Sequence, residues 1–246
     1  MEERGRKPYY LFSPWLRIFH WTMVCCMPVL FLTGLYIGNP FFITSQGFEP
    51  TFVVGRFMSM ETIRFVHFAA AYILLAALIL RIYGFIINRG DRLLPRFWTR
   101  AYWEGFFDTL QHYLFLRRRH KPYLRNALAR ASYLGVYCLL LGELITGFTM
   151  YAMIRPNSMA AVVLAPLISL VSNEYWLHII HHVIAWCFVL FAIVHVYMAA
   201  RADLVENEGE ISSMFTGYKY LSHTPMDAGE VTDEKDDHSG NRQHTA

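Results

Sequence analysis

Histidines inside apolar stretches are the residues of this sequence whose type and spacing suggest chemistry. Eleven histidines are present, and five lie within or at the mouth of long apolar stretches: His20, His67, His181, His182 and His195. Ionisable side chains in a hydrocarbon environment are rare and are usually functional. A single such histidine can also serve packing or an interhelical hydrogen bond. The arrangement of the set therefore decides what it indicates.

The last apolar stretch carries two histidines on one helical face. His181 and His195 are 14 residues apart, which in an α-helix leaves them about 40° apart around the axis and about 21 Å apart along it. By the same geometry, His182 would lie about 140° from His195, and His178 about 100° from it. This helix is therefore predicted to present one imidazole near each membrane surface, along a single stripe.

Membrane-spanning helices are needed to position these histidines, and the composition predicts them. Hydrophobic residues make up 55% and charged residues 17% of the 246 residues, against roughly 45–50% and about 25% in soluble domains. A helix needs about 20 apolar residues to cross the hydrocarbon. Four stretches meet this requirement: residues 18–38, 65–87, 132–154 and 176–200. A soluble enzyme domain, a disordered chain and a nucleic-acid-binding module are thereby excluded.

Other segments are assigned by length and composition. Residues 159–171 are apolar but too short to span, so we expect an interfacial segment or a cap over the bundle. Residues 102–116 are expected to form an amphipathic helix along the membrane face. Residues 211–221 are apolar enough to dock on another part of the protein. We expect one membrane domain over residues 1–221, followed by an acidic, disordered tail over residues 222–246.

Lysine and arginine in the connecting segments predict the orientation. Ten basic residues lie between the second and third spans, and four precede the first span. The two other connections contain only Arg56 and Arg155, with Arg64 at the membrane edge. We therefore expect an all-α membrane protein, a four-transmembrane-helix bundle with both termini in the cytoplasm. We predict no removable signal peptide, because the polar, basic N-terminus lacks a short apolar region with a cleavage site.

The predicted orientation pairs the histidines by depth. The first span starts in the cytoplasm and the fourth ends there, which puts His20 and His195 in the cytoplasmic half. The second and fourth spans both start outside, which puts His67 and His181 in the outer half. Two imidazoles at each of two levels are the ligand set of b-type haem held without covalent thioether bonds. Zinc would need about four ligands at one point; a proton relay and packing remain alternatives.

Two repeated patterns accompany the histidines. Arg17 and Arg64 each precede a histidine by three residues, in RIFH and RFVH, where a guanidinium could bind the carboxylate of a haem propionate. Arginines at helix ends equally mark the membrane interface. The pairs Thr33–Gly34 and Thr146–Gly147 lie near the outer ends of the first and third spans. Their glycines would let a flat macrocycle approach the backbone, although small residues also serve ordinary helix contacts.

The stretches that contain these histidines also carry a family resemblance. They are RIFHW (17–21), IRFVHFAAAYI (63–73), LRIYGF (80–85), ITGF (145–148), HVYMAARAD (195–203) and ISSMFTGYK (211–219). The sequence resembles the b-type cytochrome subunits of membrane-bound NiFe hydrogenases and, more distantly, the gamma subunits of respiratory formate dehydrogenases. The resemblance covers residues 9–220, which is nearly everything except the tail.

The resemblance implies a role in electron transfer. Such a subunit anchors the large and small hydrogenase subunits on the outer face of the bacterial inner membrane. Electrons pass from an iron–sulfur cluster of the small subunit through the outer and inner b haems to quinone. In this interpretation His67 and His181 hold the outer haem iron, and His20 and His195 the inner one. The four cysteines form no C-x-x-C motif, and this chain is expected to have no hydrogen-activating site of its own.

Less specific residues complete the prediction. By family analogy the quinone site lies at the cytoplasmic end, where Asn126 and Arg130 are candidates, although Asn126 also suits a helix cap. His112 and His120 are expected to be solvated, and Glu143 departs from the apolar family pattern. We expect Glu143 to be neutral with a structural role, proton exchange near a haem being the alternative. The alternative functions are a stand-alone or differently partnered transmembrane b-type reductase and a haem-free membrane anchor.

Overall fold

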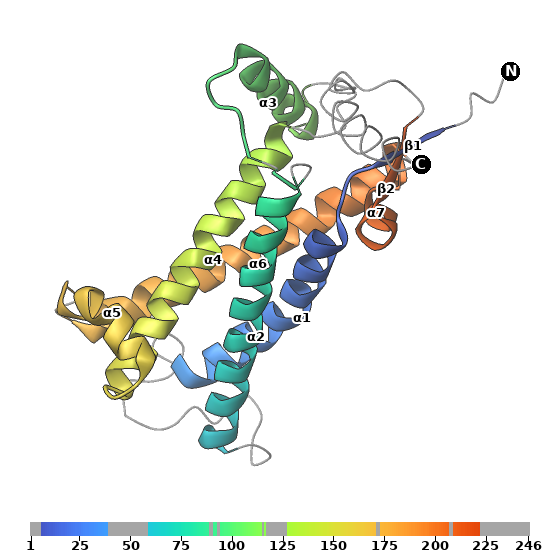
Figure 1. Cartoon of the computed structure of the whole chain (residues 1–246). Coiled ribbons are helices and arrows are strands. Elements are labelled where there is room, and N and C mark those ends of the chain that lie inside the picture. Colours follow the sequence, from blue (N-terminus) through green and yellow to red (C-terminus); the bar gives the residue numbers. More distant parts are fainter. Residues whose placement is uncertain are drawn as a thin grey trace, which may run out of the picture. The chain divides into compact units, whose positions relative to one another are not determined.

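The computed structural model describes residues 6–38, 59–88, 91–92, 94–114, 116, 127–170, 173–206 and 209–221. Four long helices dominate this part of the chain (Figure 1): α1 (Pro14–Gly38), α2 (Met60–Ile87), α4 (Ala127–Ile154) and α6 (Glu174–Glu206). All four are long and apolar enough to cross a membrane. This confirms the predicted all-α class and its four spans.

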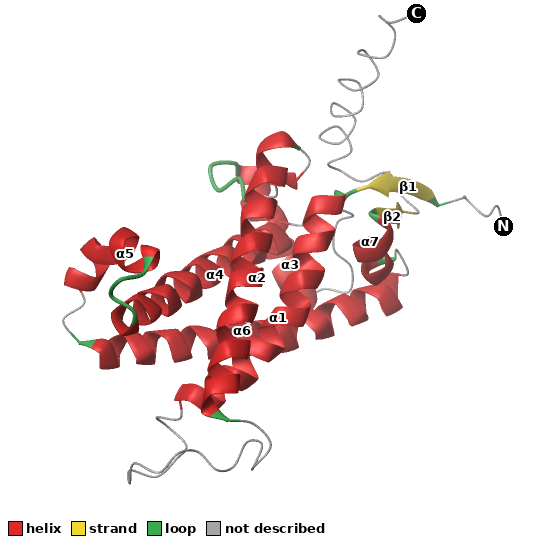
Figure 2. Ribbon diagram, turned by 60° about the horizontal axis from the view of Figure 1, so that its bottom comes forward, coloured by secondary structure: helices red, strands yellow, loops and turns green. Residues whose placement is uncertain are grey.

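In the described part of the chain, three shorter helices and one two-stranded β-ribbon connect or flank the spans (Figure 2). Helices α3 (Arg100–Tyr113) and α5 (Met159–Leu170) form where the sequence predicts an amphipathic and a short apolar segment. Helix α7 (Glu210–Thr216) is followed by strand β2 (Tyr218–Leu221), which pairs antiparallel with β1 (Lys7–Tyr10). The segment over residues 211–221 thus docks on the N-terminal segment, a pairing that the sequence did not predict.

Helices α1, α2 and α6 begin two to five residues earlier than their hydropathy predicts, because capping residues set their starts. Ser13 caps α1 through the Leu16 N–H, and Pro14 follows at the first helical position, where its missing N–H costs nothing. Ser59 caps α2 through the Thr62 N–H at 3.2 Å. Asn173 caps α6 through the Tyr175 N–H at 2.9 Å. The polar first turns of these helices are therefore helical, although only the apolar residues that follow them are predicted to lie in the hydrocarbon.

The chain forms two compact units, each built from separate stretches of sequence. Unit 1 contains Met1–Arg17, Arg81–Tyr137 and Val194–Ala246, and unit 2 contains Ile18–Leu80 and Cys138–Ile193. Each long helix contributes one part to each unit. The predicted boundary between a membrane domain and a tail at residues 221 and 222 stays a prediction, since residues 222–246 lie outside the described residues.

Within unit 2, side-chain contacts join the four helices in a closed order. Helices α1 and α2 meet through Thr33 and His67, and α2 meets α4 through aromatic rings 5.0 Å apart, Phe68 and Tyr151. Helix α4 contacts α6 through Thr146 and His181. The α6–α1 contact closes the circuit through the rings of Phe31 and Trp186, also 5.0 Å apart. Unit 2 is therefore a four-helix bundle.

Large apolar side chains are exposed along all four long helices. Leu32 is 57% exposed, Phe65 72%, Leu141 53% and Leu190 65%. Such exposure would be costly in water but is favourable in hydrocarbon, where lipid tails are as apolar as leucine. The outward faces of the bundle are thus suited to lipid contact.

Candidate functional site

The His67 imidazole of α2 is held by a hydroxyl from α1. Thr33 Oγ1 lies 2.6 Å from the Val29 carbonyl oxygen and 2.8 Å from His67 Nδ1. A threonine hydroxyl has a single proton, and the short bond to Val29 uses it. The oxygen therefore accepts a hydrogen bond from Nδ1–H. In this tautomer, inferred from the hydrogen bonds, His67 Nε2 has a lone pair free for a metal.

The His181 imidazole of α6 is held in the same way by α4. Thr146 Oγ1 donates to the Gly142 carbonyl oxygen at 2.7 Å and lies 2.8 Å from His181 Nδ1. The same proton count makes Nδ1 the donor and leaves Nε2 as the free ligand atom. The two histidines predicted to share the outer haem thus belong to one unit and carry the same tautomer. They are close enough to interact electrostatically.

A second acceptor on His181 is Glu143 of α4. Its Oε2 lies 2.7 Å from His181 Nδ1, and the two side chains are only 14% and 18% exposed. The mid-span carboxyl group thus makes a hydrogen bond across helices. Metal-bound histidines commonly donate their other ring N–H to such a carboxylate, which fixes the ring and raises its basicity as a ligand.

Glycines next to the two threonines leave room for the imidazoles. A Cβ atom at Gly34 would lie 3.5 Å from His67 Cε1, and one at Gly147 would lie 3.2 Å from His181 Cε1. The Thr–Gly pairs that the sequence singles out therefore act on the histidine rings themselves. The sequence predicted the glycines as clearance for a macrocycle and gave the threonines no role. The recurrence of Thr–Gly 34 and 35 residues before a histidine is the signal that could have found them.

The neighbouring His182 points to a different helix from His181. A Cβ atom at Gly38 of α1 would lie 2.0 Å from His182 Nε2, so this ring packs directly against the α1 backbone. His181, one residue earlier, contacts α4. His178 is partly exposed and lies 3.4 Å from Glu174, one turn earlier on the same helix. His181 and His182 thus face different helices, while the choice of His181 as the haem ligand stays a prediction.

The predicted inner ligands, His20 and His195, belong to different units, and their pairing stays a prediction. His20 is partly buried in unit 2, and its ring lies edge-on to Trp21 with centroids 5.4 Å apart. His195 belongs to unit 1, where its side chain interacts electrostatically with Glu210 of α7.

The two arginines of the R-x-x-H pattern have different surroundings. Arg17 Nη1 donates a hydrogen bond to the Phe215 carbonyl oxygen of α7, and its side chain also bonds to Tyr10. Arg64 is exposed. Arg17 therefore links α1 to the C-terminal segment of unit 1. Binding of haem propionates by either arginine stays a prediction.

The predicted quinone residues are only partly described. Asn126 lies outside the described residues, whereas Arg130 of α4 is buried at 8% exposure. Tyr102 of α3 is close enough for Arg130 to act on it, and its hydroxyl has no hydrogen-bond partner among the described residues. Burial raises the pKa of the Tyr102 hydroxyl, and the Arg130 charge opposes part of that rise. A buried, unpaired hydroxyl beside a cation is suited to binding a polar ligand.

The expectation that His112 is solvated is wrong. His112 is 6% exposed, and its Nε2 lies 3.4 Å from Arg201 Nη1. Helix α3 turns its polar residues Asp108, Thr109 and His112 inward and exposes aromatic rings such as Trp103. A polar residue in a basic loop suggests solvation, but tertiary contacts with α6 override this. His120 lies outside the described residues.

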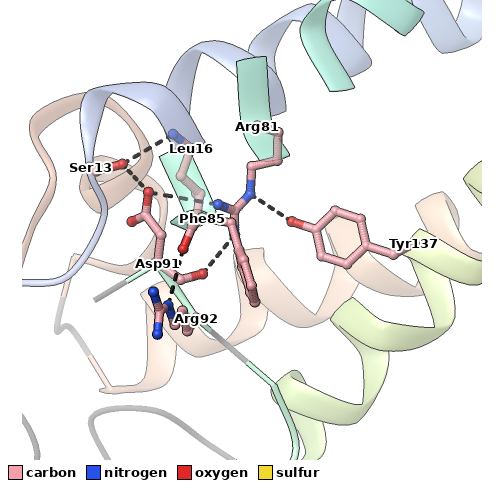
Figure 3. Close-up of polar contacts among 7 residues, drawn as sticks. All are labelled: Ser13, Leu16, Arg81, Phe85, Asp91, Arg92 and Tyr137. Carbon is pink, nitrogen blue, oxygen red and sulfur yellow. Dashed lines mark hydrogen bonds and ion pairs between the residues drawn. The ribbon is translucent and has the colours of Figure 1, made fainter. Parts of the chain in front are cut away.

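A buried ion pair in unit 1 was not predicted (Figure 3). Arg81 of α2 is 3% exposed and Asp91 is 1% exposed. Arg81 Nη1 lies 3.7 Å from Asp91 Oδ2, and Nη2 donates to the Asp91 carbonyl oxygen at 2.7 Å. Arg81 Nε donates to the Tyr137 hydroxyl at 2.8 Å, and Ser13 donates to Asp91 Oδ2. The pair thereby joins the start of α1, the end of α2 and α4.

Comparison with known proteins identifies the family. The family model described as prokaryotic cytochrome b561 matches residues 11–217. The chain belongs to the prokaryotic cytochrome b561 family. It is therefore a multi-pass membrane protein and a b-type cytochrome, and this membership implies haem b. The predicted recognition and its haem cofactor are confirmed at this level.

Curated relatives within this family are b-type cytochrome subunits by name. The chain is 33% identical to the probable Ni/Fe-hydrogenase 1 B-type cytochrome subunit of Escherichia coli (strain K12), covering 86% of this chain and 90% of the relative. It is 34% identical to the probable Ni/Fe-hydrogenase B-type cytochrome subunit of Cupriavidus necator, with 87% of each chain covered. The corresponding Rhodobacter capsulatus protein is 30% identical over 88% of this chain and 83% of the relative.

The residues of unit 2 fit the cofactor that the family implies. Haem b needs axial ligands with a free lone pair and backbone that leaves their rings room. His67 and His181 meet the first requirement through Nε2, and Gly34 and Gly147 meet the second. When bound, haem b supplies one-electron redox chemistry between its ferric and ferrous states.

Proposed function

We propose that this cytochrome b561-family protein is the membrane subunit of a NiFe hydrogenase. In this role it anchors the small and large hydrogenase subunits on the outer face of the bacterial inner membrane. It passes electrons from an iron–sulfur cluster of the small subunit through two b haems to the quinone pool, with both of its termini in the cytoplasm. The names of the curated relatives support the hydrogenase partner.

One observation carries the proposed electron-transfer role. Two imidazoles of unit 2, on different helices, are each held at Nδ1 by a threonine hydroxyl whose own proton is already donated to the backbone. Packing alone does not require this shared tautomer. Axial ligation does, because Nε2 must be unprotonated to bind iron. We infer that His67 and His181 bind the outer haem and that His20 and His195 bind the inner one.

In the proposed electron-transfer path, quinone is the final acceptor and binds at the cytoplasmic side of the membrane. Buried Arg130 and the Tyr102 hydroxyl, which has no hydrogen-bond partner among the described residues, support an acceptor site near the start of α4, which would also include Asn126. A cation and a phenolic O–H can both donate hydrogen bonds to a quinone carbonyl. Basic residues elsewhere in the connection before α4 would meet anionic lipid head groups.

A spectrum and a co-purification together test the proposed function. The reduced-minus-oxidised absorption spectrum of the purified protein is expected to contain b-type bands. A colourless protein would leave only a membrane anchor. Affinity purification of the full chain from mildly solubilised membranes is expected to bring an iron–sulfur subunit with it. Haem without such a partner would instead indicate a stand-alone reductase.

A further inference from the structure

We propose that Glu143 is a positioning residue that lowers the midpoint potential of the outer haem through its hydrogen bond to His181. This inference rests on the proposed function, in which His67 and His181 are the axial ligands of that haem. It adds to that function a residue that acts on one ligand without touching the iron.

The two ligands differ in what accepts their Nδ1 proton. His67 Nδ1 faces a neutral oxygen, the Thr33 hydroxyl at 2.8 Å. His181 Nδ1 faces the Thr146 hydroxyl at 2.8 Å and, in addition, Glu143 Oε2 at 2.7 Å. The carboxyl group is therefore the feature that distinguishes the α6 ligand from the α2 ligand.

The geometry fixes the direction of this hydrogen bond. The Thr146 proton goes to the Gly142 carbonyl, so Nδ1 of His181 carries its own proton, and the Thr146 hydroxyl and Glu143 Oε2 share it as acceptors. Glu143 Oε1 is buried and has no hydrogen-bond partner among the described residues. Within the described bundle, the contact with His181 is thus the hydrogen bond that this carboxyl group makes.

A carboxyl acceptor on Nδ1 changes the electron donation of the imidazole ligand, and not only the packing of the helices. Drawing Nδ1–H toward a carboxyl oxygen raises the electron donation of Nε2. Greater donation stabilises the ferric state more than the ferrous state, because the ferric iron has the higher positive charge. A buried site strengthens the effect, since the low local dielectric screens it less than water does. The midpoint potential of the outer haem is therefore lower with Glu143 than without it.

The test is a redox titration of the purified full-length protein, followed by haem absorption. The outer haem is the component that disappears in the His67→Ala variant. In Glu143→Leu we expect its potential to rise by about 59 mV, a tenfold change in the one-electron equilibrium. Glu143→Gln keeps an acceptor oxygen of similar shape, so its rise should be smaller. The g-values of the oxidised outer haem in electron paramagnetic resonance should change in the same order.

The matched control is Glu174→Gln on α6. This substitution also removes one acidic group near the start of the fourth span, but Glu174 is 56% exposed and contacts His178 instead of His181. Its outer-haem potential is expected to equal that of the wild type. An equal shift in Glu174→Gln would overturn the proposal, since general charge would then explain the effect.

The remaining outcomes also decide the question. An unchanged outer potential in both Glu143 variants would show that this residue has no influence on the haem. Loss of the outer haem from the near-isosteric Glu143→Gln would show that Glu143 is needed for binding, not for adjustment of the potential. Failure of the proposed function looks different, because the His67→Ala variant would then retain the full haem content of the wild type.

Discussion

Thr33 Oγ1 of α1 lies 2.8 Å from His67 Nδ1 of α2, and the pair repeats in Thr146 of α4 and His181 of α6 at the same distance. The threonine stands 34 residues before the histidine in one case and 35 residues before it in the other. Each threonine is followed by a glycine that faces the same imidazole. In each of two helix pairs of unit 2, a histidine is thus held by a threonine hydroxyl at Nδ1 and faced by the glycine that follows that threonine.

Replacing either outer ligand is the most direct test of this arrangement. We expect His67→Ala and His181→Ala each to lose the outer haem, because one imidazole cannot replace two axial ligands. In the proposed hydrogenase complex, hydrogen-dependent quinone reduction should stop, while the proposed partner subunits still reduce an artificial dye. Absorption spectra and both assays on purified complexes measure this. Normal quinone reduction in both variants would contradict the assignment of these ligands.

Removing the neighbouring imidazole should have little effect. His182 packs on Gly38 of α1 and not on the α4 residues that hold His181. His182→Ala is therefore expected to give a haem spectrum close to that of the wild type. The same spectra measure it, with His181→Ala as the matched control one residue away. Loss of haem in His182→Ala would mean that this residue is the ligand and that the helical phase was misjudged.

The hydroxyl of Thr33 should matter more than its shape. Thr33→Val keeps the side-chain volume but removes an acceptor of the His67 Nδ1–H, and outer-shell substitutions of this kind typically weaken metal binding about 10-fold to 100-fold. We expect a loss of outer haem in that range, measured as haem content per protein during dialysis against apomyoglobin. Thr33→Ser retains the hydroxyl and should retain the haem. Equal haem retention in Thr33→Val and Thr33→Ser would show that the Thr33 hydroxyl does not affect haem binding.

The two ring-facing glycines should differ in their tolerance of a methyl group. At Gly147 the added Cβ would lie 3.2 Å from His181 Cε1, and that ring cannot easily move away because its Nδ1–H is shared between Thr146 and Glu143. At Gly34 the corresponding distance to His67 Cε1 is 3.5 Å, an ordinary contact. We expect Gly147→Ala to lower outer-haem affinity about tenfold and Gly34→Ala to leave it nearly unchanged. The reverse order of haem retention would contradict the geometry.

The Arg81–Asp91 pair is predicted to stabilise unit 1. Asp91→Ala would leave the Arg81 guanidinium buried without its counter-charge, at an expected cost of about 3–5 kcal/mol. Glu174→Gln removes the exposed contact with His178 and should cost less than about 1 kcal/mol. Thermal unfolding of the detergent-solubilised protein, followed by tryptophan fluorescence, compares the two. Similar melting temperatures for both variants would show that the buried pair contributes little.

Composition and helical periodicity alone predicted the spans and the face that His181 and His195 share. Crossing hydrocarbon requires a long apolar run whatever the neighbouring helices are, so each span can be recognised from its own residues. The phase of two residues on one helix follows from the helix repeat, also without reference to the rest of the fold. The starts of α1, α2 and α6 depended on capping residues such as Ser13 and Asn173, whose side chains bond to the backbone just ahead of them.

The tertiary structure alone decided which residues act on those histidines. Glu143 is 38 residues from His181 in the sequence, and Asp91 is 78 residues from Ser13; no local pattern relates such positions. Hydrogen bonds between helices depend on how far each helix slides and turns against the next, which is a property of the packed bundle. The same is true of His112, which lies in a basic segment yet is buried beside Arg201. The sequence determined at which positions of the helices the imidazoles lie, and helix packing determined which of the two ring nitrogens of His67 and His181 is free.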